Sequence, residues 1–173
     1  MYSYAYPHPA VTTDIVIFSI RDEALKVLLI KRAGKPYKGK WALPGGFVRE
    51  DEDLDTSALR ELEEETGVRD VYLEQLYTFG EPQRDPRERV ITVAYYALIA
   101  SDQVSLCAAT DAEAVGWFGL DETPLLAFDH AGIIAMAHER LIAKLDYSTI
   151  AFQFMPENFT LTQLQAVYEV ILG

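Results

Sequence analysis

The sequence predicts an α/β protein in which helices pack on the faces of a sheet. Runs of β-branched and aromatic residues, most clearly 11–20 and 89–100, indicate strands. Apolar residues recur at helical spacing in 130–145, and helix-capping residues flank 54–66. Strands and helices alternate in groups along the chain, which is the order expected when helices cover a sheet.

The first fifty residues are expected to form strands and tight connections. Polar residues 21–24 separate two β-branched runs, so these runs predict a hairpin. Gly34, Pro36 and Gly39 indicate a loop that follows it. The expected order is strand 11–20, turn 21–24, strand 25–31, loop 33–40, strand 41–43, turn 44–46 and extended chain over 47–49.

The rest of the chain is expected to alternate between helix and strand. Asp53 or Asp55 is suited to cap the start of the first helix, and Gly67 to end it. Asp129 is expected to cap the second helix, and Thr160 with Gln163 forms a capping-box pattern before a third. The expected elements are helix 54–66, strands 71–79, 89–100 and 115–120, helix 130–145 and a helix after Thr160.

Length and charge restrict the function. The 173 residues suit one domain, taken as 1–148, with a helical appendage over 149–173. A net charge of −12 argues against a nucleic-acid surface. The single cysteine, Cys107, excludes an internal disulfide and fits a reducing cytoplasm. No signal peptide or membrane span is expected, so the sequence predicts a cytoplasmic protein without membrane contact.

The most informative stretch is the acidic first helix. Glu61, Glu64 and Glu65 fall on one face, whereas Leu59 and Leu62 are expected to pack on the sheet. Like charges four residues apart repel by ~0.2–0.5 kcal/mol per pair. A solvated acidic face is one interpretation. The other is a site for a hard cation such as Mg²⁺ or Mn²⁺, which carboxylate oxygens bind well.

The spacing of this stretch resembles a known signature. It reads Gly46-x5-Glu52-x7-Arg60-Glu61-Leu62-x-Glu64-Glu65-x-Gly67-Val68, preceded by Trp41-Ala42-Leu43-Pro44-Gly45-Gly46. This pattern resembles the complete box of the Nudix hydrolase family. The resemblance implies a Nudix-type α/β/α sandwich with a mixed sheet from about residue 11 to 145, and hydrolysis of a nucleoside diphosphate linked to another group.

The resemblance also implies roles for individual residues. Glu52, Glu61, Glu64 and Glu65, with the main-chain carbonyl of Gly46, would bind the metal, and Arg60 would orient the glutamates. Glu61 and Glu65 are therefore expected to be catalytic, together with Arg60. The general base is either Glu61 or a residue of a later loop. Glu113 is the candidate there, with a solvated loop acid as the equal alternative.

The segment 81–89 suggests the substrate. It resembles ADP-ribose pyrophosphatases and the Nudix-related regulators of NAD metabolism, through Pro82 and the arginines that follow. ADP-ribose is therefore the expected ligand, cleaved to AMP and ribose 5-phosphate. The candidate substrate-binding residues are Arg49, Arg84, Arg87 and Arg89, with ordinary surface arginines as the alternative.

The C-terminal segment leaves a second function open. Residues 149–173 resemble the linker and first helix of the winged-helix domain of those regulators, through 159–165. A helix docked on the domain is the alternative. The chain is thus an ADP-ribose hydrolase or the ADP-ribose-sensing part of a regulator without its DNA-binding domain, and the intact box favours catalysis. A homodimer is expected, with Tyr2, Tyr4 and Tyr6 at its interface, and the chain alone is not expected to bind nucleic acid.

Overall fold

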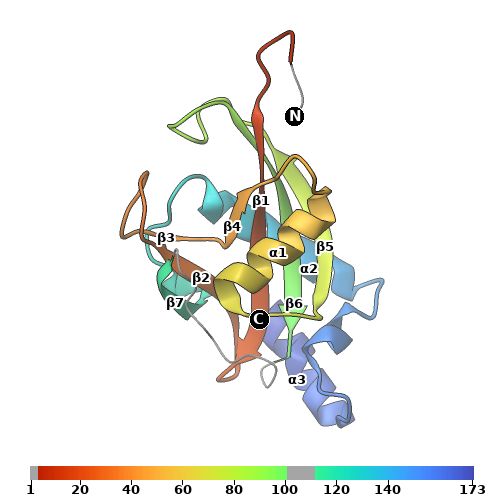
Figure 1. Cartoon of the computed structure of the whole chain (residues 1–173). Helices are drawn as coiled ribbons and strands as arrows, with labels where there is room; N and C mark the ends of the chain where they lie inside the picture. Colours follow the sequence, from red (N-terminus) through yellow and green to blue (C-terminus); the bar gives the residue numbers. More distant parts are fainter. Residues whose placement is uncertain (1–3, 101–111) are drawn as a thin grey trace.

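A computed structural model describes residues 4–100 and 112–173 of the chain, so Tyr2 and Cys107 lie outside the described residues. Figure 1 shows the arrangement of the elements. In chain order these are β1 (Ala10–Arg21), β2 (Ala24–Arg32), β3 (Trp41–Ala42), β4 (Gly45–Phe47), α1 (Leu54–Thr66), β5 (Tyr72–Phe79), β6 (Val90–Ile99), β7 (Ala112–Gly119), η1 (Leu120–Glu122), α2 (His130–Leu145), η2 (Ile150–Phe154) and α3 (Leu161–Leu172).

The strands of the described ranges form one mixed sheet. Its main order is β3-β2-β1-β6-β5, with β4 paired to β1 and β7 paired to β2. β1 and β6 run parallel over ten paired positions, whereas the other pairings are antiparallel. The predicted mixed sheet is confirmed. β1 is its central strand, and residues of β1 therefore reach both the α1 face and the α2 face.

The two long helices cover opposite faces of this sheet, with α1 in front and α2 behind in the view of Figure 1. Alternate residues of a strand point to opposite faces. Ile15 and Ile17 accordingly join Leu62 of α1 in one core cluster. Val16 and Phe18 join α2 residues in the other, namely Ile133, Ile134, Ala137, Leu141 and Leu145. The predicted sandwich of two helical layers around a sheet is confirmed.

Three local expectations differ from the structure. Gly45 and Gly46 belong to β4 and pair with Asp14 and Thr13 instead of forming a turn. Leu59 is 45% exposed and does not pack on the sheet. Asp129 precedes α2, but its side chain forms no capping hydrogen bond. In each case a partner distant in sequence decides the outcome. The two glycines pair with β1, and the sheet packs against Ala58 and Leu62 of α1 instead of Leu59. The Asp129 carboxylate accepts hydrogen bonds from Arg84.

The C-terminal segment packs on the domain. The expected capping box is present, because the Gln163 N–H donates to Thr160 Oγ1 at 3.2 Å and the Thr160 N–H donates to Gln163 Oε1 at 2.8 Å. Val167 and Ile171 are buried in the α2-side core, whereas Leu161 is 83% exposed. Among the described residues, the helices are all too short or too polar to cross a membrane.

Candidate active site

Helix α1 is fixed at both ends by local interactions. Asp53 caps its start by accepting a hydrogen bond from the Thr56 N–H at 2.7 Å. Gly67 ends it in the left-handed region, at φ 74°, and its N–H donates to the carbonyl of Glu63. A left-handed residue at this position favours glycine. The caps set the register of the helix and thereby aim Glu61 and Glu65 towards β4.

The two glycines of β4 let the α1 carboxylates approach the main chain closely. The Gly45 N–H donates to Glu65 Oε2 at 2.7 Å. A Cβ on Gly45 would lie 2.2 Å from the carbonyl oxygen of Thr13, and a Cβ on Gly46 would lie 2.2 Å from Glu61 Oε1. Neither contact is possible for a real side chain. This close approach explains why the sequence carries two glycines inside a strand.

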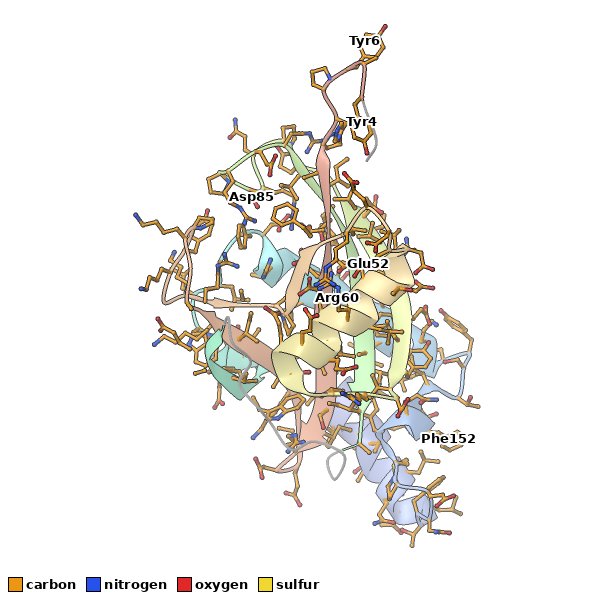
Figure 2. All side chains as sticks on the ribbon, viewed as in Figure 1. Tyr4, Tyr6, Glu52, Arg60, Asp85 and Phe152 are labelled. Carbon is orange, nitrogen blue, oxygen red and sulfur yellow. The ribbon has the colours of Figure 1, made fainter. Side chains whose placement is uncertain are left out.

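Arg60 forms hydrogen bonds with the glutamates near the contact between α1 and β4. Its Nε donates to Glu52 Oε1 at 2.5 Å, and its Nη1 donates to both Glu61 Oε1 at 2.6 Å and Glu64 Oε2 at 3.1 Å. Figure 2 shows Arg60 and Glu52 side by side, where α1 faces the chain that precedes it. The hydrogen bond from Arg60 lowers the pKa of Glu52 to about 2. Arg60 therefore holds three carboxylates in one network.

A cavity of about 570 Å³ opens beside this network. Glu61 and Glu65 line it, together with Gly45 and Gly46. Glu64 points elsewhere, with its side chain 52% exposed and paired with Arg60 and Arg49. Of the five expected metal ligands, the structure thus brings Gly46, Glu61 and Glu65 to the cavity, whereas Glu52 and Glu64 do not line it and are paired with Arg60. The remaining cavity residues come from β1, from β2 and the loop after it, from the β3–β4 segment, from the 81–89 loop, and from Phe128 and His130 around the start of α2.

The carboxylates in the cavity carry an electrostatic cost. Burial raises the pKa of Glu65 to about 8, and the negative charges of Glu61 and Asp14 add to this effect. Burial also raises the pKa of Glu61, against the opposing influence of Arg60. A bound divalent cation would offset this cost, and carboxylate oxygens suit Mg²⁺. The donor chemistry therefore fits a hard cation, although within 4–100 and 112–173 no three acidic, histidine or cysteine side chains are already clustered as ligands.

A buried ionic cluster forms another wall of the cavity. Arg84 bridges two carboxylates, reaching Asp129 at 2.7 Å and Asp14 at 3.2 Å, and its side chain is only 3% exposed. The Leu43 N–H donates to Nδ1 of His130 at 2.8 Å, which leaves Nε2 as the protonated nitrogen of the neutral ring, 3.6 Å from Asp14. Burial lowers the pKa of His130 and favours this neutral form.

The other candidate substrate-binding arginines differ in position. Arg87 lines the cavity and forms a bidentate pair with the buried Asp85. Arg89 does not line the cavity, and it donates to the main-chain carbonyls of Gly80, Glu81 and Val90. Arg49 lies outside the cavity as well, 3.5 Å from both Glu52 and Glu64. Only Arg84 and Arg87 of the four are therefore brought to the cavity.

The structure does not bring Glu113 to the cavity. Its carboxylate lies 3.7 Å from Lys31 on β2, and both side chains are well exposed. The physical reason is the pairing of β7 with β2, which aligns Ala114 with Lys31 at the outer end of the strand pair. Glu113 does not line the cavity that contains Glu61 and Glu65, so its role as the base stays a prediction from the family resemblance.

Several cavity residues were absent from the sequence-based site. Asp14, Arg32, Phe128 and His130 all line the cavity but belong to no part of the glutamate motif. One signal was available for Asp14 alone, because it is a charged residue inside a β-branched strand, where acidic residues are rare. Arg32 ends β2, His130 begins α2 and Phe128 lies in the turn before α2, so these residues are brought together only by the fold.

Two family models match the chain. The NUDIX domain model matches residues 9–137, and the NrtR DNA-binding winged helix domain model matches residues 151–173. The ADPR responsive transcriptional repressor of Acinetobacter baylyi is 42% identical over 97% of this chain and 68% of its own length. The ADP-ribose pyrophosphatase of Methanocaldococcus jannaschii is 40% identical over 75% of this chain and 73% of its own length.

Solved structures show the same relationship. A MutT/nudix family protein from Enterococcus faecalis superposes with a TM-score of 0.90 at 36% identity, covering 100% of this chain and 77% of that one. The NUDIX domain of Shewanella oneidensis NrtR, solved as a complex with ADP ribose, gives a TM-score of 0.72 at 41% identity, with coverage of 79% and 91%. The NUDIX domain model covers most of the chain, and the complete glutamate motif lies on helix α1 of the sandwich, so the chain belongs to the Nudix family.

Proposed function

We propose that the chain is a metal-dependent hydrolase that splits ADP-ribose into AMP and ribose 5-phosphate. The observation that carries this proposal is the composition of one cavity. Glu61 and Glu65 line it on one side, and the cations Arg32 and Arg87 line it on another. Its volume of about 570 Å³ lies inside the ~300–1,000 Å³ typical of small-molecule sites. The relatives that act on or bind ADP-ribose support this choice of ligand.

The residues present suggest how the site would work. Glu61 and Glu65 would hold Mg²⁺ or Mn²⁺, with Glu52, Glu64 and the Gly46 carbonyl as the further ligands of the motif. Such an ion supplies charge neutralisation at the diphosphate and an activated water. Arg60 keeps Glu52 and Glu61 oriented through its hydrogen bonds. The Gly45 N–H fixes Glu65, and the cavity also contains arginine side chains that a phosphate group can approach despite the acidic balance of the whole chain.

A substrate panel tests this function. The chain is incubated with Mg²⁺ or Mn²⁺ and ADP-ribose, NADH, dinucleoside polyphosphates or oxidised nucleotides, and the products are identified by mass. ADP-ribose is expected to disappear with equal formation of AMP and ribose 5-phosphate, and EDTA is expected to stop the reaction. Turnover of another nucleotide while ADP-ribose is untouched would refute the substrate and leave the family unchanged.

A second function is favoured by the C-terminal segment. Residues 151–173 match the NrtR DNA-binding winged helix domain model, and the Acinetobacter baylyi relative that matches over 97% of this chain is a repressor. In this alternative the cavity binds ADP-ribose as a signal. The same panel discriminates the two, because a sensor binds ADP-ribose with measurable heat but forms no AMP even after long incubation.

We also propose that the protein is a dimer. Tyr4 and Tyr6 are 58% and 83% exposed, and Figure 2 shows both on the N-terminal arm, which extends away from the domain. Exposed aromatic residues of this kind are enriched at protein interfaces. Light scattering at micromolar concentration is expected to give twice the chain mass of 19.5 kDa. A variant with Tyr4→Ser and Tyr6→Ser should shift towards the monomer, and a monomeric native chain would contradict the proposal.

A further inference from the structure

Arg32 is a half-buried cation that forms no direct ion pair with a carboxylate in the part of the chain that the structure describes. It is the last residue of β2, and it lines the cavity that contains Glu61 and Glu65. Its Nε donates to the main-chain carbonyl of Pro36 at 2.9 Å, and it forms no ion pair with any described carboxylate. A guanidinium has five N–H donors, so most of its donors have no protein acceptor in the described ranges.

The other cavity arginines are compensated. Arg84 is paired with Asp14 and Asp129, and Arg87 is paired with Asp85 through two oxygens. Their positive charge is thus already balanced inside the protein. Burial, and then the like charge of Arg87, lowers the pKa of Arg32. The charges of Glu65, Asp85 and Asp14 oppose this effect only in part. A partly buried charge without a hydrogen-bonded counter-ion is unfavourable unless a ligand supplies one.

Phe128 holds the Arg32 guanidinium in place. The guanidinium carbon lies 5.0 Å from the centre of the Phe128 ring, and Tyr37 packs edge-on against the same ring at 4.9 Å. Phe128 adopts φ 54°, a left-handed conformation that is unusual for an aromatic residue. Such strain persists where the surroundings impose it, and it is concentrated at functional sites. This cation–π contact restrains the guanidinium beside the ring. It uses none of the N–H donors, which remain available to a ligand.

We infer that Arg32, stacked on Phe128, is the residue that binds the diphosphate of the nucleotide ligand. A planar guanidinium matches two phosphate oxygens at once, which gives both affinity and orientation. This assignment rests on the proposed function for the identity of the ligand as a nucleoside diphosphate. It differs from the sequence-based choice of Arg84, which acts as an internal bridge, and of Arg89, which binds main-chain carbonyls.

Calorimetric binding in EDTA tests this role without a metal ion. The ligands are ADP-ribose, inorganic pyrophosphate and adenosine, and the variants are Arg32→Gln, Arg32→Lys and the control Arg69→Gln. Arg69 is an exposed arginine that pairs with Glu63 away from the cavity. Arg32→Gln is expected to weaken ADP-ribose and pyrophosphate at least tenfold and to leave adenosine unchanged, because adenosine has no phosphate. Arg32→Lys should fall between, since it keeps the charge but loses the planar fork.

The outcomes separate this inference from the proposed function. If the native chain binds ADP-ribose and Arg32→Gln binds it equally well, the role of Arg32 is refuted while the function stands. If the native chain binds pyrophosphate but not ADP-ribose, and Arg32→Gln loses pyrophosphate, Arg32 keeps its role and the substrate is wrong. Equal weakening of adenosine would show a structural role for Arg32 and overturn the inference. Absence of binding to both ADP-ribose and pyrophosphate by the native chain would overturn the role of Arg32, whereas the proposed function is decided separately by the substrate panel with Mg²⁺ or Mn²⁺.

Discussion

Replacement of Glu65 by glutamine is expected to lower kcat/KM for ADP-ribose at least ~100-fold, a barrier increase of about 2.7 kcal/mol. Glutamine keeps the shape of the side chain and can still accept the hydrogen bond from Gly45. It removes an anionic oxygen, however, from the cavity where the metal is proposed to bind. The loss should therefore be chemical, with the fold retained.

Stability should move in the opposite direction from activity. Without metal, the Glu65→Gln chain is expected to be as stable as the native chain or more stable, because a buried carboxylate beside Glu61 and Asp14 has been removed. The stabilisation that Mg²⁺ adds should shrink. Thermal unfolding with and without Mg²⁺ measures both effects.

Glu63→Gln is the matched control on the same helix, since Glu63 is exposed, pairs with Arg69 and should retain activity. Full activity of Glu65→Gln, or inactivity caused by unfolding, would overturn the proposed role.

Replacement of Arg84 by methionine is expected to destabilise the protein by about 3 kcal/mol. Removing one partner of a buried ion pair typically costs ~3–5 kcal/mol because an uncompensated charge remains inside. Here Asp14 would remain as the buried charge, with Asp129 next to it. We expect a destabilisation at the lower end of this range because the Asp129 side chain is 31% exposed and can be hydrated. Urea unfolding measures this change.

A multiple variant identifies the cause of that loss. Arg84→Met combined with Asp14→Asn and Asp129→Asn leaves no unpaired buried charge, so it should be more stable than Arg84→Met alone. Arg69→Met, at the exposed pair with Glu63, should change stability by no more than about 0.5 kcal/mol. A change of that small size for Arg84→Met itself would mean that the cluster contributes little to the fold.

The first helix shows how far local sequence can predict a structure. The residues that cap α1 are Asp53 and Gly67, and each forms its hydrogen bond with a residue three or four positions away. Their effect can therefore be predicted from local sequence alone. The i, i+4 spacing likewise placed Glu61 and Glu65 on one face, and the structure has both in the cavity. The alternating strands and amphipathic α2 predicted the sandwich for the same reason, because side-chain direction follows from backbone period.

Local rules failed where a distant residue competed for the same group. Asp129 has the type and position of a helix cap, but the buried guanidinium of Arg84 offers a stronger, charged partner 45 positions away. The Pro-Gly-Gly sequence reads as a turn, but β1 supplies a pairing strand, and Gly45 and Gly46 extend the sheet. An ion pair or the hydrogen bonds of strand pairing stabilise the chain more than a helix cap or a turn preference does. The partner in such an interaction cannot be identified from the residues next to it in sequence.

The sequence by itself therefore determined the family, the sandwich and the carboxylate half of the site, since each depends on short-range spacing. The cationic half was decided only by tertiary structure. Arg32 at the end of β2 meets Phe128 of the chain before α2, and Asp14 of β1 meets Arg84 of the 81–89 loop. A buried charge pairs with an opposite charge that is close in space, whatever their separation in sequence. The carboxylates that the folded chain places beside each cavity arginine therefore decide whether that arginine can bind a ligand.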